Sequence, residues 1–377
     1  MRILVFNPSY PPVACGVGDY PHGLAAALTQ AGHDVAVVTA TGATMPADGP
    51  PRVLPLLGNW DVSSFVRGWP RFARPRVDLV VTGFPAVVRS SRSRLMYLLP
   101  AVAKALLGWP RVTYIVHEFI RTGELHRRLL ALALFAADRI VTVTEAERDA
   151  IAARYPALAN RIVVQYNAPS IPVAADDATA DGDLRAVLAP LGRPVIAFFG
   201  FVWAPDKGFE ELLAAMAQTD ATLVVTGSLD PANAYHNHVA AVIERLGLAE
   251  RIRWLGFVPA EEVGRVLRVV DAVVLPFRRG AEGGYTSLLA ALVNGAAVIT
   301  TRGPQNPAWL RDFESAVLVD PEDVDGLARA LRRVLSDRHL ATRVRAGART
   351  LEFGWDEIVA AVTDVVPARR GPRHPPE

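Results

Sequence analysis

The chain has 377 residues and a formal net charge of +2, which is enough length for two domains and too little charge to demand a nucleic acid partner. Its single cysteine, Cys15, excludes an internal disulfide framework and a cysteine-based zinc site, and fits a cytoplasmic protein. Of the 40 basic residues only Lys104 and Lys207 are lysines, so each stands out against an arginine-rich background.

The first half of the chain alternates short β-branched runs with longer amphipathic stretches, a pattern that predicts parallel strands joined by crossover helices. The runs are almost continuously apolar, as expected for strands covered by helices on both faces. We expect six of them, starting at Arg2, Asp34, Asp78, Arg111, Arg139 and Arg161. Residues 1–170 are therefore predicted to form a doubly wound α/β domain.

The amino-acid composition of the sequence changes after Asn167. Residues 171–192 are rich in Ala, Asp and Pro without a hydrophobic period, which predicts a linker with a surface loop. A second doubly wound domain is predicted over 193–352, and a disordered Pro- and Arg-rich tail over 367–377. The expected strands of the second domain start at Pro194, Thr222, Arg251, Ala272, Ala297 and Ala316. Because such sheets bind ligands at the carboxyl ends of their strands, we expect the active site in a cleft between the domains.

Two loops of the first domain are candidates for ligand contact. After the first strand, Gly16 and Gly18 permit a tight turn, and a helix from about Tyr20 would point its amides at a ligand. This is not the GxGxxG dinucleotide fingerprint, and a simple strand-to-helix connection is the alternative.

His117 and Glu118 end another strand, where they could contact a substrate hydroxyl or leaving group. A hydrogen-bonded structural histidine is the alternative there, and no GxSxG nucleophile elbow is present.

The second domain opens with a strand, a loop and a helix start at which Lys207 and Gly208 lie. A lysine at the positive end of a helix dipole is a natural phosphate ligand, although a solvated surface lysine is the alternative. The stretch from Pro276 to Thr301 repeats this design.

In that stretch we predict a helix with Thr286 or Ser287 as N-cap and Gly295 at its end. Gly283 and Gly284 would let the backbone approach a ligand, with the amides of the first helical turn facing an anion. Glu282, Arg278 and Arg279 lie on the same loop. Glu282 could accept hydrogen bonds from sugar hydroxyls, and the two arginines are either phosphate ligands or exposed charges.

These motifs, in this order, resemble the GT-B fold retaining glycosyltransferases of family 4. The similar segments are "YPPVACGVGDY", "VHEF", "FGFVWAPDKGFEELL", "LGFVPAEEVGRVLRVVDAVVLPF" and the closing "FGWDEIVAAV". The resemblance covers about Met1 to Val366. It implies two Rossmann-like domains facing a central cleft, and a final helix over 353–366 that returns to the first domain.

The resemblance also assigns expected roles. Catalytic roles are implied for His117, Lys207 and Glu282, and acceptor contacts for Asp19, Tyr20 and Glu118. Contacts with the nucleotide-sugar donor are expected from Gly16, Val17, Gly18, Gly200, Phe201, Phe257, Arg278, Arg279, Gly283, Gly284, Tyr285, Thr286 and Ser287. No metal ion and no cofactor are expected beyond the nucleotide-diphosphate sugar itself.

Two positions depart from the family pattern. The family has a second glutamate, for the ribose, eight positions after the first, and that position is Ala290 here. The arginine that accompanies the lysine on the diphosphate falls on Phe201. We expect Arg278 or Arg279 to compensate for the missing cation.

The expected function is metal-independent transfer of a hexose-type sugar to an acceptor hydroxyl with retention of configuration, in glycoconjugate or secondary-metabolite biosynthesis. A nucleotide-sugar epimerase and a degenerate accessory subunit without a donor are the alternatives. The acceptor could be a small molecule, a glycan or a lipid-linked sugar. We expect no signal peptide, because a proline follows the first short apolar run, and no membrane span, because no window reaches ~18 uninterrupted apolar residues. Basic apolar segments from Phe65 and Val87 would either touch an anionic membrane at its inner face or form ordinary solvated helices.

Overall fold

The chain divides into two compact units. The computed structural model describes residues 1–8, 10, 16–40, 51–58, 60–72, 76–84, 97–108, 110–169, 171–188, 194–200, 202 and 205–363. Unit 1 comprises Met1–Ala168 together with the segment that begins at Gly354, and unit 2 comprises Pro169–Phe353. The predicted disordered tail, 367–377, lies outside the described residues.

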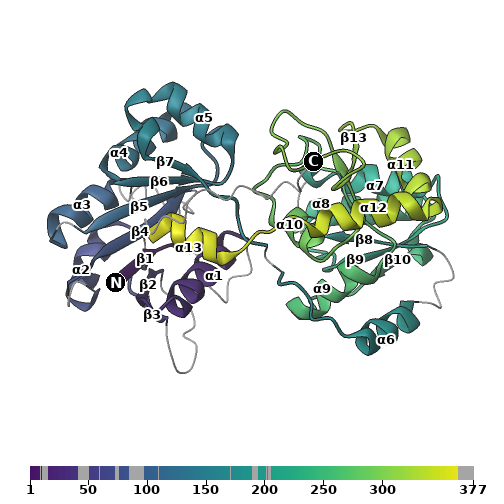
Figure 1. Ribbon diagram of the computed structural model, residues 1–377, viewed down its shortest axis with the longest axis horizontal. Coiled ribbons are helices and arrows are strands. Elements are labelled where there is room, and N and C mark those ends of the chain that lie inside the picture. Colours follow the sequence, from purple (N-terminus) through teal and green to yellow (C-terminus); the bar gives the residue numbers. More distant parts are fainter. Residues whose placement is uncertain are drawn as a thin grey trace. The chain divides into compact units, whose positions relative to one another are not determined.

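Unit 1 is built on a seven-stranded parallel sheet in the order β3-β2-β1-β4-β5-β6-β7 (Figure 1). Its strands are β1 (Arg2–Phe6), β2 (Asp34–Thr39), β3 (Arg52–Pro55), β4 (Leu79–Phe84), β5 (Arg111–Val116), β6 (Arg139–Thr142) and β7 (Ile162–Val164). All six strands expected from the sequence are present. Strand β3 was not expected, because it is short and lies at the sheet edge, where only one neighbour pairs with it.

Helices cover both faces of this sheet. Successive side chains of a strand point to opposite faces, so β1 contributes Ile3 and Val5 to one core and Leu4 and Phe6 to the other. The first core is completed by α1 (Gly16–Gln30) and α13 (Trp355–Thr363). The second is completed by α2 (Val62–Phe72), α3 (Leu99–Leu106), α4 (Glu124–Ala136) and α5 (Glu145–Arg154). This arrangement explains why the strand sequences are continuously apolar.

The closing helix α13 packs along α1 in unit 1 (Figure 1). A Cβ atom on Gly23 of α1 would lie 2.2 Å from Cζ2 of Trp355, so only glycine leaves space for the indole ring. The close approach of the two helices therefore depends on this pair of residues, which are more than 300 positions apart in the chain.

Unit 2 contains a six-stranded parallel sheet in the order β10-β9-β8-β11-β12-β13. Its strands are β8 (Val195–Phe199), β9 (Thr222–Thr226), β10 (Ile252–Trp254), β11 (Ala272–Leu275), β12 (Val298–Thr301) and β13 (Val317–Val319), as predicted. Its helices are α6 (Ala178–Leu188), α7 (Phe209–Met216), α8 (Ala234–Arg245), α9 (Ala260–Val269), α10 (Thr286–Val293), α11 (Val324–Ser336) and α12 (Arg338–Arg349). Helix α7 packs against α8 and α11, and α10 against α9 and α12. The two-domain α/β fold class is confirmed.

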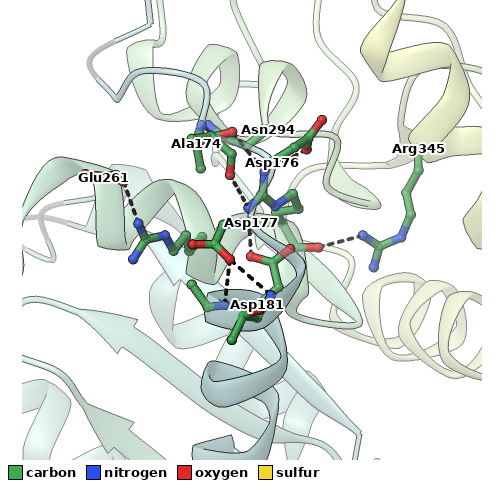
Figure 2. Close-up of polar contacts among 12 residues, drawn as sticks. Ala174, Asp176, Asp177, Asp181, Glu261, Asn294 and Arg345 are labelled. Carbon is green, nitrogen blue, oxygen red and sulfur yellow. Dashed lines mark hydrogen bonds and ion pairs between the residues drawn. The ribbon is translucent and has the colours of Figure 1, made fainter.

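The predicted linker over 171–192 is not a continuous loop, because it contains α6, which packs on α9. The segment before α6 and the start of this helix are fixed to the rest of unit 2 by polar contacts (Figure 2). Arg268 donates to the Ala174 carbonyl at 2.9 Å and to Asp181 at 2.7 Å, and Asn294 accepts from the Ala174 amide at 2.9 Å. Only Asp181 and Leu188 of α6 are buried, which explains why its sequence carries no hydrophobic period.

Candidate functional site

The strand order of unit 2 reverses between β8 and β11, which are hydrogen-bonded neighbours. In doubly wound sheets ligands bind beside the carboxyl ends of the strands at this reversal. The loop after β8 leads to Lys207, and the loop after β11 leads to Glu282. Two of the sequence-predicted segments therefore leave the sheet at the point where a ligand is expected.

A glycine holds these two loops against each other. Gly208 has a left-handed backbone with φ of 67°, and a Cβ atom there would lie 1.8 Å from the Pro276 carbonyl oxygen. The Arg278 amide also donates to the Asp206 carbonyl at 3.1 Å. The backbone beside Lys207 is thus fixed relative to the β11 loop.

Lys207 is half-buried, and its ammonium lies over two aromatic rings. Its Nζ atom is 5.2 Å from the ring centroid of Phe277 and 5.0 Å from that of Tyr285. The two rings are themselves 4.4 Å apart. Both distances from the ammonium to a ring are within the range of a cation–π contact, so Lys207 is not a freely solvated surface lysine.

Helix α10 begins beside this lysine. Its N-cap is Tyr285, which makes no side-chain capping hydrogen bond, so the prediction of Thr286 or Ser287 as N-cap is wrong. Because the first amides of a helix have no partner within the helix, those of Thr286 and Ser287 can bind an anion. At the other end, Asn294 is the C-cap and Gly295 follows with φ of 68°, as predicted.

The end of β8 lies next to the start of α10. Gly200 has φ of 141°, a backbone conformation that favours glycine. A Cβ atom on Gly200 would be 3.9 Å from Cβ of Ser287, which is ordinary contact. Gly200, Lys207 and the start of α10, each predicted separately as a donor contact, therefore meet in unit 2.

The β11 loop is anchored by residues that the sequence reasoning missed. Gly280, with φ of 85°, would place a Cβ atom 2.5 Å from the Cα atom of Gly303. Asn306 donates through Nδ2 to the Ala281 carbonyl at 2.7 Å and accepts from the Gly303 amide at 2.8 Å. Thr301 donates to the Phe277 carbonyl at 2.7 Å. A glycine after each of two neighbouring strands was the available signal for this contact.

The two arginines of the β11 loop have different surroundings. Arg278 donates through Nε to Glu211 at 2.6 Å and lies 3.6 Å from Glu210, both in the first turn of α7. Its charge is therefore balanced within the protein. Arg279 is exposed and lies 3.8 Å from Asp206. Of the two, Arg279 is the better placed to compensate for a missing cation.

The structure also locates the departures from the family pattern. Ala290 is fully buried in α10, and its carbonyl accepts from the Asn294 side chain at 2.9 Å. Phe201 lies outside the described residues. Phe257, an expected donor contact, follows the Gly227–Gly256 bridge after β10, and this residue is 78% exposed.

In unit 1, His117 follows β5 and packs against the ring of Tyr20, which in turn packs against Trp355. Its ring centroid is 4.8 Å from that of Tyr20 in an edge-on arrangement, and Trp355 lies 5.4 Å from Tyr20. Burial lowers the pKa of His117 to about 4, and burial raises the pKa of Tyr20. His117 is therefore a neutral imidazole at pH 7. The sequence reasoning did not single out Trp355 for this cluster.

The loop that carries His117 is fixed by a buried acid. Glu147 accepts from the Phe119 amide at 2.8 Å and from the Ile120 amide at 3.1 Å. Glu147 lies in the first turn of α5, whose N-cap is Thr144. The Thr-x-x-Glu spacing is the sequence signal of a capping box and could have indicated this residue. Glu118 is exposed.

The remaining predicted residues lie at the start of α1. This helix begins at Gly16, four residues earlier than predicted, so Gly16 and Gly18 belong to its first turn rather than to a tight connection. The side chains of Val17 and Asp19 lie outside the described part of the structure.

The described ranges lack two kinds of feature. They contain no group of three or more His, Cys, Asp or Glu side chains that could hold a metal ion. Among their helices, none combines the length and the apolar character that a membrane span requires.

Two protein families match the chain. Glycosyltransferase Family 4 matches residues 14–169, and the family of group 1 glycosyl transferases matches residues 183–351. A 2-deoxystreptamine N-acetyl-D-glucosaminyltransferase of Streptomyces fradiae is 30% identical over 64% of this chain and 59% of its own length. A D-inositol 3-phosphate glycosyltransferase of Corynebacterium glutamicum is 26% identical over 61% of this chain and 57% of its own. The chain thus spans less than two thirds of these relatives.

Solved structures share the fold over nearly the whole chain. HepE of Anabaena, in complex with UDP and glucose, has a TM-score of 0.74 at 17% identity and covers 97% of this chain and 99% of its own. The sucrose-phosphate synthase of Thermosynechococcus elongatus has a TM-score of 0.73 at 19% identity, with coverages of 97% and 98%. With both halves of the chain matched in the expected order, this protein belongs to the family 4 glycosyltransferases of the GT-B fold.

Proposed function

We propose that this protein transfers a hexose-type sugar from a nucleotide-diphosphate sugar to an acceptor hydroxyl. The observation that supports this most directly is the meeting of Lys207 with the uncapped start of α10 at the strand reversal of unit 2. A cation and free helix amides are together suited to a diphosphate. Glu282, four residues before Thr286 at the start of α10, would accept hydrogen bonds from the sugar.

The proposed chemistry is stabilisation of the departing diphosphate. As the bond from the sugar to the phosphate breaks, negative charge develops on the phosphate oxygen, and fixed positive groups lower the barrier. Lys207 and the α10 amides would supply these groups without a metal ion. Transfer at full rate in the presence of excess EDTA is the expected result, and loss of activity that Mg²⁺ or Mn²⁺ restores would contradict it.

We further propose that the sugar keeps its anomeric configuration, as in the family that the chain resembles. The leaving phosphate oxygen would accept the proton of the acceptor hydroxyl on the same face of the sugar. His117, neutral at pH 7, would accept or donate one hydrogen bond to substrate rather than carry a charge. The anomeric coupling constant of the product, measured by NMR, distinguishes retention from inversion.

For the acceptor we propose a polyhydroxylated ring, because the named relatives act on 2-deoxystreptamine and on inositol 3-phosphate. A lipid-linked acceptor would require membrane contact. Helix α2 supports that option in a limited way, since Val66 is 59% exposed and Arg67 and Arg71 are exposed beside it. Salt-sensitive pelleting with phosphatidylglycerol vesicles, weakened in R67E/R71E, is the expected result for a cytoplasmic protein that meets the membrane. Residues 87–96 of the basic segment from Val87 lie outside the described residues.

Ala290 favours a second candidate, an accessory subunit that no longer binds a sugar donor. Its buried methyl group offers no acceptor for a ribose hydroxyl. A screen of UDP-, GDP-, ADP- and dTDP-sugars, with and without acceptors, decides between the two functions. Release of free nucleotide together with a glycosylated product supports the transferase. Absence of binding by every sugar nucleotide supports the accessory subunit, and an epimerised sugar nucleotide would indicate isomerase chemistry instead.

A further inference from the structure

The aromatic contact of Lys207 joins two sections of chain that the sheet topology brings together. Lys207 precedes α7, whereas Phe277 and Tyr285 are at the two ends of the β11 loop. The distances of 5.2 and 5.0 Å are measured from Nζ, so it is the charged end of the lysine, not its aliphatic stem, that lies over the rings. An ammonium so placed is attracted by the negative faces of the rings.

The position of each ring is itself fixed. Phe277 is 1% exposed, and its carbonyl accepts from Thr301. Tyr285 is the N-cap of α10, and its ring packs on that of Phe277, with the two centroids 4.4 Å apart. Gly208 blocks displacement of the lysine backbone, because it packs directly on the Pro276 carbonyl. The lysine is therefore held from both ends, by Gly208 at its backbone and by the rings at its ammonium.

We infer that Phe277 and Tyr285 are positioning residues that seat the Lys207 ammonium beside the start of α10 before any ligand arrives. A lysine side chain has many rotamers, and it loses most of this freedom when it binds an anion. Seating the ammonium in advance means that the diphosphate meets an ordered cation. The significance of this positioning for catalysis rests on the proposed transferase function, whereas the positioning of the ammonium can be tested without that function.

The test uses the scarcity of lysine. With only Lys104 and Lys207 in the chain, the rate of acylation of each amine can be followed by peptide mass spectrometry in one sample. Lys104 is an internal control, because its Nζ lies 2.7 Å from Asp138 in unit 1, whereas the changed residue belongs to unit 2. Acylation requires the neutral amine, so a cation–π contact slows it.

The variants are Tyr285→Leu, which removes the ring, and Tyr285→Phe, which keeps it. We expect Lys207 in Y285L to react about two- to tenfold faster than in the wild type, from the ordinary strength of such contacts. Lys207 in Y285F should react at the wild-type rate, and Lys104 should be unchanged in both. Equal Lys207 rates in wild type and Y285L, with Lys104 unchanged, would overturn the inference.

UDP binding then tests whether this positioning of Lys207 strengthens the binding of a diphosphate. Because Tyr285 is also an expected donor contact, the readout is a comparison of the two backgrounds: Y285L should weaken the binding of UDP by a several-fold larger factor in a Lys207 background than in a K207M background. Equal weakening by Y285L in both backgrounds would contradict a role through Lys207. If Lys207 becomes more reactive in Y285L but the wild-type protein binds no nucleotide, the positioning of Lys207 by the rings is supported and the proposed function fails.

Discussion

Replacing Gly208 by alanine tests whether the two loops of the candidate site depend on one close contact. The left-handed conformation costs an alanine about 1 to 2 kcal/mol. Its Cβ atom would also lie 1.8 Å from the Pro276 carbonyl oxygen, so one loop must move. Overpacking of this kind costs about 1 to 3 kcal/mol more. The expected loss of unfolding free energy in unit 2 is therefore about 2 to 5 kcal/mol.

Gly247 provides a matched control in the same unit. It has φ of 65°, almost the value of Gly208, but a Cβ atom there would meet nothing within 4 Å. G247A should therefore show only the backbone cost, about 1 to 2 kcal/mol. Hydrogen exchange of the β8 and β11 amides in increasing urea measures the stability of unit 2 separately.

UDP titration of the same two variants measures the effect on the site. G208A should weaken UDP binding, because the backbone of Lys207 moves with the loop, whereas G247A should bind like the wild type. Equal destabilisation by the two substitutions, together with unchanged UDP binding, would refute the reasoning.

Three further predictions concern the acids and the histidine. Because burial lowers the pKa of His117 to about 4, the unfolded chain binds its proton first, and the free energy of unfolding should fall as the pH drops from about 6.5 to 4. H117Q should flatten this dependence in urea unfolding curves, and an NMR titration of wild type that gave a pKa near 6.5 would contradict it. Glu147→Ala leaves the amides of Phe119 and Ile120 unsatisfied, so unit 1 should lose about 2 to 4 kcal/mol, with faster exchange of those amides; unchanged exchange would count against the anchor. Glu282→Gln should weaken binding of the sugar nucleotide roughly ten- to a hundredfold while leaving the free nucleotide unaffected, and calorimetry with both ligands checks this.

The sheets could be predicted from the sequence because burial on both faces leaves a strong, local signal. Continuous apolar runs such as those at Arg2 and Pro194 mark strands covered by helices. Helix α6 could not be predicted in this way, since it is held by Arg268 and Asp181 rather than by an apolar stripe. Its stability depends on a partner 87 residues away in the chain.

The candidate site was predictable where a single loop carries the signal. The lysine after β8 and the glycine-rich loop after β11 can be read locally, and the resemblance to family 4 placed them in one site. The aromatic contacts of Lys207, the Gly280–Gly303 approach and the Glu147 anchor join residues from different loops. Pairings of this kind depend on strand order, which apolar periodicity does not specify.

The central claim is that unit 2 holds the diphosphate of a nucleotide sugar with Lys207 and the start of α10. The most direct measurement is a calorimetric titration of wild type, K207A and K104A with a panel of nucleotide-diphosphate sugars. The claim predicts that at least one sugar nucleotide binds the wild type, that K207A binds it roughly ten- to a hundredfold more weakly, and that K104A is unchanged. Binding of that ligand to K207A with wild-type affinity, or no binding to the wild type by any member of the panel, would contradict the claim.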